Sequence, residues 1–258
     1  MSALGVQPSF NDLLHKVFRF TNRCRAMKKK LLGTTLITIC SALVLSRAMA
    51  GSLVGVVRFI DEPAKTAPVK VSKDQDYCGE SLPNETYVID PEGGLKNVVV
   101  FIETPPDSAE SNTQKENILN NSGCRYSPRI LAMQMGERLK VKNNDPKLHI
   151  PHSYHEERTV FNLSLPFRGT TIDATARIRQ AGVLKVVCDT HAWMLAYIHV
   201  FDHPYFAVTD DHGSFSMPNL PAGTYILKAW HEDAGLKSQQ ISVAETGEVR
   251  TVFEFRKN

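Results

Sequence analysis

The chain has 258 residues, enough for one or two ordinary domains, and 22% of them are charged. Its formal net charge of +3 is unevenly distributed, because residues 1–50 contain eight of the 30 Lys and Arg residues and one of the 27 Asp and Glu residues. Residues 51–258 therefore hold 22 basic and 26 acidic residues, a net charge of −4. A mildly acidic chain gives no sign of a nucleic-acid partner, and we expect none.

The first expected element is an export signal. Three lysines follow Met27, residues 31–45 are mostly apolar, and residues 46–50 end in a small-x-small cleavage site. The apolar run is shorter than the roughly 20 residues that a transmembrane helix needs. We therefore expect a signal peptide cleaved after Ala50, a periplasmic protein, and no stable membrane span after cleavage. The length of residues 1–26 leaves open whether translation starts at Met1 or at Met27.

From residue 51 onward the pattern predicts short β-strands and no long helix. Residues 138–143 and 251–255 alternate polar with apolar side chains. Further β-branched or aromatic runs, bounded by turn residues, lie at 54–59, 97–102, 183–187 and 196–201. Residues 104–123 are rich in Pro, Ser, Asn and Glu, which predicts an exposed loop. Many short strands with Gly- and Pro-rich turns predict an all-β sandwich or small barrel.

The sequence Asp202-His203-Pro204 marks a break in this pattern. We expect one domain over residues 51–203 and a small second β module over residues 204–258. About 55 residues form a marginal core by themselves. The module is therefore expected to pack on the first domain or to share strands with residues 51–103.

Residues 51–258 contain three cysteines, Cys78, Cys124 and Cys188. An odd number in an exported protein suggests one disulfide and one thiol kept for another purpose. Cys78 and Cys124 lie in polar, turn-rich segments without a histidine at ligand spacing, which favours a disulfide between them. That pairing leaves Cys188 free. The alternatives for Cys188 are a buried structural thiol or a disulfide with one of the other two.

A Cys-x-x-His-x-x-Met run, formed by Cys188, His191 and Met194, lies between two predicted strands. A thiolate, an imidazole and a thioether on one tight turn can converge on one ion. Two histidines, one cysteine and a weak axial methionine form the ligand set of blue copper sites. The second histidine must come from elsewhere, and His149 and His152 follow the alternating strand about 40 residues upstream.

These residues resemble the cupredoxins, and among them the amicyanins, which share the loop and a His-x-x-His segment upstream. The resemblance implies a Greek-key β-sandwich with His149, Cys188, His191 and Met194 as copper ligands. It implies that His152 is a surface histidine or contacts a ligand. The alternative is a site that uses both His149 and His152 as ligands. Residues 120–235 also resemble bacterial proteins often labelled methylamine-utilisation proteins. Residues 211–225 look like the carboxypeptidase-regulatory or transthyretin-like β-sandwich module.

The resemblance implies one type 1 copper ion and a carrier of single electrons, with a periplasmic redox partner such as a cytochrome or a copper enzyme. We expect no enzyme, because a single Cys-x-x-His run offers one site whose positions are all filled by protein. The chain departs from the family at Ile150, Pro151 and Ala192, which affects the surroundings of the site more than its ligands. The alternatives are a periplasmic copper carrier or chaperone, and a β-sandwich interaction module with a vestigial metal loop.

Overall fold

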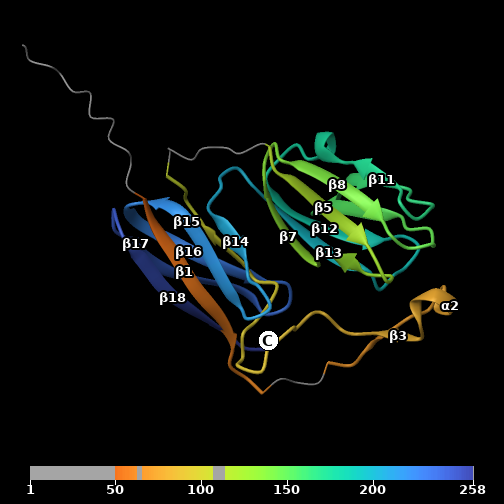
Figure 1. The fold of residues 1–258 in the computed structure, drawn as a ribbon, viewed down its shortest axis with the longest axis horizontal. Helices are drawn as coiled ribbons and strands as arrows, with labels where there is room; N and C mark the ends of the chain where they lie inside the picture. The colour runs from red at the N-terminus through yellow and green to blue at the C-terminus, as the bar shows by residue number, and fades with distance from the viewer. Residues whose placement is uncertain (1–49, 63–65, 107–113, 258) are drawn as a thin grey trace, which may run out of the picture. The chain divides into compact units, whose positions relative to one another are not determined.

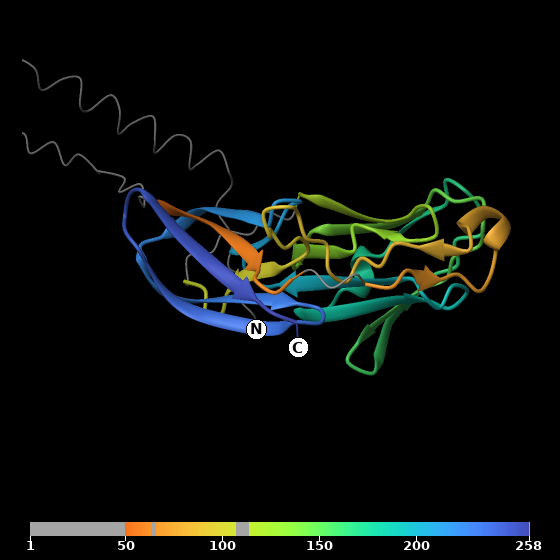
Figure 2. The ribbon, with the colours of Figure 1, turned by 90° about the horizontal axis from the view of Figure 1, so that it is seen from below.

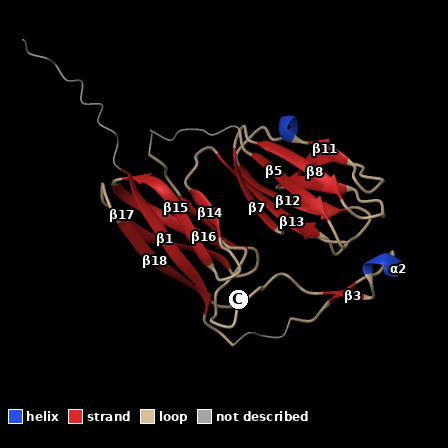
Figure 3. Cartoon of the chain, viewed as in Figure 1, coloured by secondary structure: helices blue, strands red, loops and turns tan. Residues whose placement is uncertain are grey.

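The structure is a computed structural model that describes residues 50–62, 66–106 and 114–257. Residues 1–49 of the predicted signal peptide, with the two possible start sites, lie outside these residues. The regular secondary structure of the described chain is almost all strand, which confirms the all-β prediction (Figure 3). Its helical elements are short: α2 (Gln75–Cys78) and the 3-10 turn η1 (Thr175–Arg177). Within the described ranges, no helix is both long and apolar enough to cross a bilayer.

Two sheets enclose one core and form what we call the first sandwich. One sheet has the order β10-β9-β12-β13-β7 and the other β11-β8-β5-β6. Inward side chains of both sheets, among them Leu119, Val141 and Ile198, pack in a single cluster. The strands are β5 (Glu116–Asn121), β6 (Tyr126–Ser127), β7 (Ile130–Gln134), β8 (Arg138–Asn143), β9 (Pro151–His155), β10 (Arg158–Asn162), β11 (Thr171–Asp173), β12 (Gly182–Cys188) and β13 (Leu195–Phe201).

A second sandwich has its own core, built between the sheets β15-β1-β18 and β14-β4-β16-β17. Two of its strands precede the first sandwich in the chain, so residues from both ends of residues 50–257 share this core. The strands after residue 204 therefore pack against apolar residues of β1 and β4. The domain boundaries at residues 203 and 204 stay a prediction. Its strands are β1 (Ala50–Phe59), β4 (Val99–Ile102), β14 (Phe206–Val208), β15 (Ser214–Pro221), β16 (Gly223–His231), β17 (Gly235–Val243) and β18 (Glu248–Phe255).

Between β1 and β4 the chain forms a small structure at residues 69–82, which we call the strap. It consists of β2 (Val69–Lys70), α2 and β3 (Ser81–Leu82), and β2 pairs with β3 (Figures 1 and 2). Its Cys78 forms the predicted disulfide with Cys124, with an S–S distance of 2.01 Å. The disulfide and Val71 form a small apolar cluster against which Trp193 packs. The strap is thereby covalently tied to the first sandwich.

The predicted loop over residues 104–123 is wrong in its second half, where the structure places β5. This strand pairs in parallel with β8, and its odd-numbered residues point into the core. Two of these inward residues are asparagines whose amide nitrogens donate hydrogen bonds inside the protein. Asn117 donates to Glu137 over 2.8 Å, and Asn121 donates to the carbonyl of Lys142 over 2.7 Å. Buried polar side chains with internal partners break the apolar alternation by which such a strand is recognised.

The two sandwiches make polar and aromatic contacts with each other. The Arg129 guanidinium donates two hydrogen bonds to the Glu232 carboxylate, over 2.5 and 2.7 Å, and both side chains are largely buried. The rings of Tyr197 and Trp230 meet edge-on with centroids 5.2 Å apart. A bidentate Arg–carboxylate pair has a fixed geometry, so this contact holds the end of β16 against the start of β7.

Buried histidines make the stability of the fold depend on pH. His199 is 3% exposed on β13, its ring is tilted against that of Trp230 with centroids 4.4 Å apart, and its Nε2 has no hydrogen-bond partner among the described residues. Burial lowers the pKa of His199 to about 3, and burial also lowers the pKa of His203 and of His231. Each of these imidazoles therefore stays neutral in the folded protein at a pH where an unfolded histidine is protonated.

We expect the free energy of unfolding to fall as the pH drops below about 6.5, since the unfolded chain then binds protons that the folded chain excludes. For His199 alone the loss between pH 6.5 and 4.5 is roughly 2–3 kcal/mol, at about 1.4 kcal/mol per pH unit. Urea unfolding gives the free energy of unfolding of the wild type and of His199→Phe at both pH values. The contribution of His199 is the difference between the two proteins in how much this free energy falls from pH 6.5 to pH 4.5. If the free energy of unfolding fell equally with pH in the two proteins, His199 would be protonated in the folded state.

Candidate metal centre

Cys188, His191 and Met194 lie on the short turn between β12 and β13. Cys188 is the last residue of β12 and pairs with Pro151 on β9. Backbone hydrogen bonds from His191 to the Cys188 carbonyl and from Met194 to the His191 carbonyl wind the turn tightly. Cys188 is 3% exposed, His191 0% and Met194 2%. The turn therefore directs all three side chains into the end of the first sandwich.

His149 reaches the same place from the segment that follows β8. The backbone of His149 forms a two-way bridge with Leu165, with N–O distances of 3.2 and 2.9 Å. The buried amide of Asn143 donates to the carbonyls of Lys147 and Leu165 and holds the intervening loop. His149 is fully buried. This loop is thus fixed by hydrogen bonds rather than by a regular ladder.

The ligand atoms of His149, Cys188 and His191 lie within 4.8 Å of one another. The Cys188 Sγ is 3.9 Å from the Nδ1 of His149 and 3.8 Å from the Nδ1 of His191. Typical metal–thiolate and metal–imidazole bonds are about 2.3 and 2.0 Å long, and a trigonal arrangement of such bonds separates sulfur from nitrogen by about 3.7 Å. The three residues therefore fit a single ion, and one sulfur with two imidazole nitrogens suits copper or zinc.

The surroundings of Cys188 favour its thiolate. Burial raises the pKa of the thiol, but contacts with His149, His191 and Thr190 outweigh burial and bring the pKa to about 5. The Thr190 Oγ1 lies 3.1 Å from the sulfur, and the Ile150 amide donates to it over 3.4 Å. Because the thiolate is the form that binds metal, the site is prepared for an ion at neutral pH.

Asp145 contacts the nitrogen of His149 that points away from the Cys188 sulfur. Its carboxylate accepts from the His149 Nε2 at 3.0 Å, from the amides of Gly123 and Cys124 at 2.7 and 2.9 Å, and from the Tyr77 hydroxyl at 2.9 Å. Although burial raises the pKa of Asp145, these hydrogen bonds bring it down to about 2. An ionised carboxylate only accepts, so the Nε2 of His149 carries a proton and the Nδ1 faces the sulfur.

Asp74 holds His191 in the same way. Its carboxylate Oδ2 lies 3.0 Å from the His191 Nε2, and Lys147 pairs with the same carboxylate at 3.4 Å. Burial raises the pKa of Asp74, but the contacts with His191 and Lys147 hold it below the ordinary value. Each histidine of the cluster therefore has a carboxylate on its outer nitrogen, an arrangement that fixes the ring and raises its basicity as a ligand.

The structure separates the two upstream histidines. His152 lies on β9, where its Nδ1 is 3.2 Å from Asp189 and its Nε2 is 2.9 Å from the Thr159 hydroxyl. Its side chain is 16% exposed and stacks on Tyr154. Both ring nitrogens are thus engaged outside the cluster that contains His149. Met194 is buried in the same apolar core as Cys188.

Asp74, Asp145 and Thr190 were not predicted from the sequence. Asp145 precedes His149 by four residues, and this spacing is the one local signal that could have suggested a partner. Asp74 is 117 residues from His191, and no sequence pattern links the two. Thr190 lies inside the predicted turn, where its hydroxyl donates to the Leu148 carbonyl over 3.0 Å. These residues contact the candidate ligands, and the sequence did not reveal them because only the tertiary structure brings them to the cluster.

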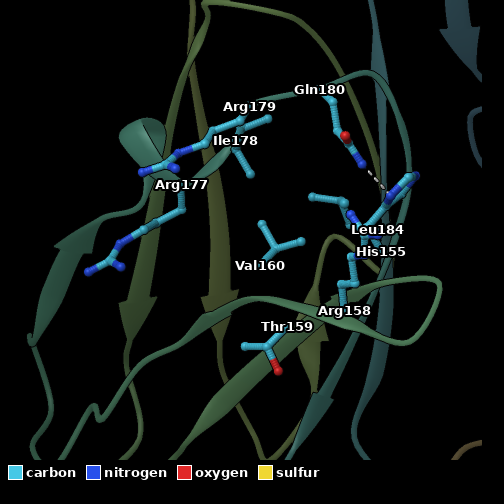
Figure 4. Close-up of a pocket in the computed structure, with 9 residues that line it drawn as sticks. All are labelled: His155, Arg158, Thr159, Val160, Arg177, Ile178, Arg179, Gln180 and Leu184. Carbon is cyan, nitrogen blue, oxygen red and sulfur yellow. Dashed lines mark hydrogen bonds between the residues drawn. The ribbon is translucent and has the colours of Figure 1, made fainter.

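A separate hollow of about 330 Å³ lies at the other end of β12 (Figure 4). Leu184 lines it, four residues before Cys188, which corresponds to about 13 Å along a strand. Figure 4 shows Gln180 hydrogen-bonded to His155 on one side and the side chains of Arg177 and Arg179 extending on the other. None of the cluster residues lines this hollow, so it is not part of the candidate metal centre.

Comparisons with known proteins find remote structural likeness alone. No protein-family model matches the chain, and no curated protein matches it by sequence. The chain is similar to a copper-containing nitrite reductase from Thermus scotoductus, with 16% identity, a TM-score of 0.30, and coverage of 38% of this chain and 25% of that chain.

Smaller copper proteins are similar to the chain over most of their own length. A purple cupredoxin from Nitrosopumilus maritimus is 23% identical, with a TM-score of 0.29 and coverage of 34% of this chain and 99% of that chain. A variant of amicyanin with Cu(I) is 15% identical, with a TM-score of 0.29 and coverage of 39% and 97%. TM-scores this low carry no argument by themselves, so the function proposed below depends on the geometry of the cluster.

Proposed function

We propose that the protein is an exported type 1 copper protein that carries single electrons between periplasmic redox partners. His149, Cys188 and His191 would be the strong ligands and Met194 the weak axial ligand. The observation that carries the proposal is the convergence of one sulfur and two Nδ1 atoms at separations of 3.8 and 3.9 Å. A set of two histidines and one cysteine with a distant methionine is typical of blue copper sites.

Bound copper would supply one-electron chemistry by alternating between Cu(II) and Cu(I). The protein's own contribution is a fixed and dry environment. Both histidines are fully buried and tied to carboxylates, and Cys188 is held by Thr190 and Ile150. Ligands that are held independently of the metal need little rearrangement when its charge changes, which favours electron transfer. Burial of the ligands also argues against ready exchange of copper with a carrier protein.

The partner follows from the same proposal. An exported electron carrier needs a donor and an acceptor in its compartment, such as a cytochrome or a copper enzyme. Trp193 offers one contact point, because its half-buried ring lies edge-on to His191 with centroids 5.0 Å apart. The indole Nε1 donates to the Cys124 carbonyl over 3.0 Å, which fixes the ring beside the cluster.

Addition of Cu(II) to the purified protein tests the proposal. We expect an intense visible thiolate-to-copper charge-transfer band, which disappears on reduction by ascorbate and returns on oxidation without loss of copper. Addition of Zn(II) to the same protein is the control, because zinc occupies the ligands without producing the band or the redox cycle. A colourless protein that retains no copper would reject the proposal and favour the interaction module.

A further inference from the structure

The outer edge of the metal centre is closed by the strap, a segment that neither sandwich requires for its core. His191 is 0% exposed, and the side chain that faces its Nε2 is Asp74. Asp74 has a left-handed backbone with φ of 53° and immediately precedes α2. Its position therefore depends on how the strap is held.

Several contacts hold the strap on the loops that carry the histidines. The Cys78–Cys124 disulfide ties the end of α2 to the first sandwich, and the Cys124 amide donates to Asp145. The Tyr77 hydroxyl donates to the same carboxylate. Lys147, two residues before His149, pairs with Asp76 at 2.7 Å. One covalent bond and three polar contacts thus fix the strap, which bears Asp74 as the partner of His191, to the segments around Asp145, which is the partner of His149.

The strap also forms one wall of a hollow beside the ligand turn. This hollow has a volume of about 110 Å³ and is lined by Val69 and Leu82 from the strap and by Trp193 and Met194 from the turn. A strap that moved outward would widen the space beside Met194 and uncover His191. The burial of His191 and the small size of the space beside Met194 therefore depend on the strap staying in place.

We propose that Asp74 is a positioning residue of the metal centre and that the disulfide-tethered strap retains the bound metal. This inference rests on the proposed copper function. Asp74 would keep His191 in the orientation that presents Nδ1, and the disulfide would keep Asp74 in place. Loss of a carboxylate partner behind a histidine ligand typically reduces metal affinity about 10–100-fold.

The central variants are Asp74→Gly and Asp74→Asn. Glycine adopts a φ of 53° freely and removes the carboxylate, while asparagine tolerates this backbone and keeps one acceptor oxygen. Copper-loaded protein is mixed with excess EDTA, and the release rate is followed by loss of the charge-transfer band. We expect release about 10–100-fold faster for Asp74→Gly and close to the wild-type rate for Asp74→Asn.

Glu156→Gly is the matched control. Glu156 is an exposed acidic residue with φ of 55° in the turn between β9 and β10, so its replacement causes the same change of charge and backbone elsewhere. We expect its release rate to equal that of the wild type. The pair Cys78→Ser/Cys124→Ser should also accelerate release, and adding Asp74→Gly to it should produce little further increase, because both changes act through the same strap.

The wild-type protein in the same experiment separates the two proposals. If it forms the band and Asp74→Gly releases copper at the wild-type rate, the strap inference is overturned and the copper function stands. If the wild type forms no band with copper, the electron-carrier function fails, and release of Co(II) from the same ligands tests the strap. A protein that binds neither ion overturns both.

Discussion

Replacement of Cys188 by serine is expected to abolish the visible band of the copper-loaded protein and to weaken copper binding by more than about 100-fold. Loss of an outer partner of a ligand already costs about 10–100-fold in affinity, and here the ligand itself is removed. The band arises from the thiolate, and a serine hydroxyl does not ionise near neutral pH. Visible absorption and equilibrium dialysis against Cu(II) measure the two effects.

His152→Ala is the control for this experiment. His152 is half-buried near the start of β9, contacts Asp189 and Thr159, and lies outside the cluster around Cys188. The band should persist in this variant with an unchanged extinction coefficient. A band that survives in Cys188→Ser, or one that disappears in His152→Ala, would contradict the proposed ligand set.

Replacement of Asp145 by alanine is expected to destabilise the metal-free protein by about 3–5 kcal/mol, the range observed when one partner of a buried pair is removed. Asp145 is 1% exposed, and its carboxylate accepts from four donors on three different segments. Without it, two buried backbone amides, the Tyr77 hydroxyl and the His149 ring lose their acceptor, and each unsatisfied buried donor is costly. Urea unfolding at neutral pH measures the change.

Asp76→Ala provides the comparison. The Asp76 side chain is 73% exposed, and its partner Lys147 keeps a second contact with Asp74. Exposed ion pairs contribute little, so the expected change is below about 1 kcal/mol. Asp145→Asn keeps one acceptor oxygen, so its loss of unfolding free energy should lie between those of Asp145→Ala and Asp76→Ala. An effect of Asp145→Ala as small as that of Asp76→Ala would show that Asp145 does not organise the site.

Much of the fold was predictable from local patterns. Residues 138–143 alternate in the sequence and form β8 over the same bounds, because the inward Leu139 and Val141 meet an apolar core. Residues 183–187 and 196–201 lie within β12 and β13 for the same reason. One strand that this pattern missed is β5, whose inward asparagines donate internal hydrogen bonds that a hydrophobic pattern does not reveal.

The disulfide was also predictable, though for a different reason. Cys78 and Cys124 had no ligand-type neighbours, and an odd number of cysteines left Cys188 for another role. The function of the bond was not predictable. It links the segments that bear Asp74 and Asp145, and this follows only from where α2 lies in three dimensions.

Residue type and short spacing were enough to predict the all-β class and the turn that bears Cys188, His191 and Met194. They favoured the cysteine pairing over its alternatives, and the structure has that pairing. The tertiary structure alone decided which upstream histidine meets the thiolate: His149 lies near the sulfur while His152, three residues later, contacts Asp189. It also decided that Asp74, 117 residues from His191, completes the site. Contacts at such separations depend on strand pairing and on the path of the strap, which no local pattern encodes.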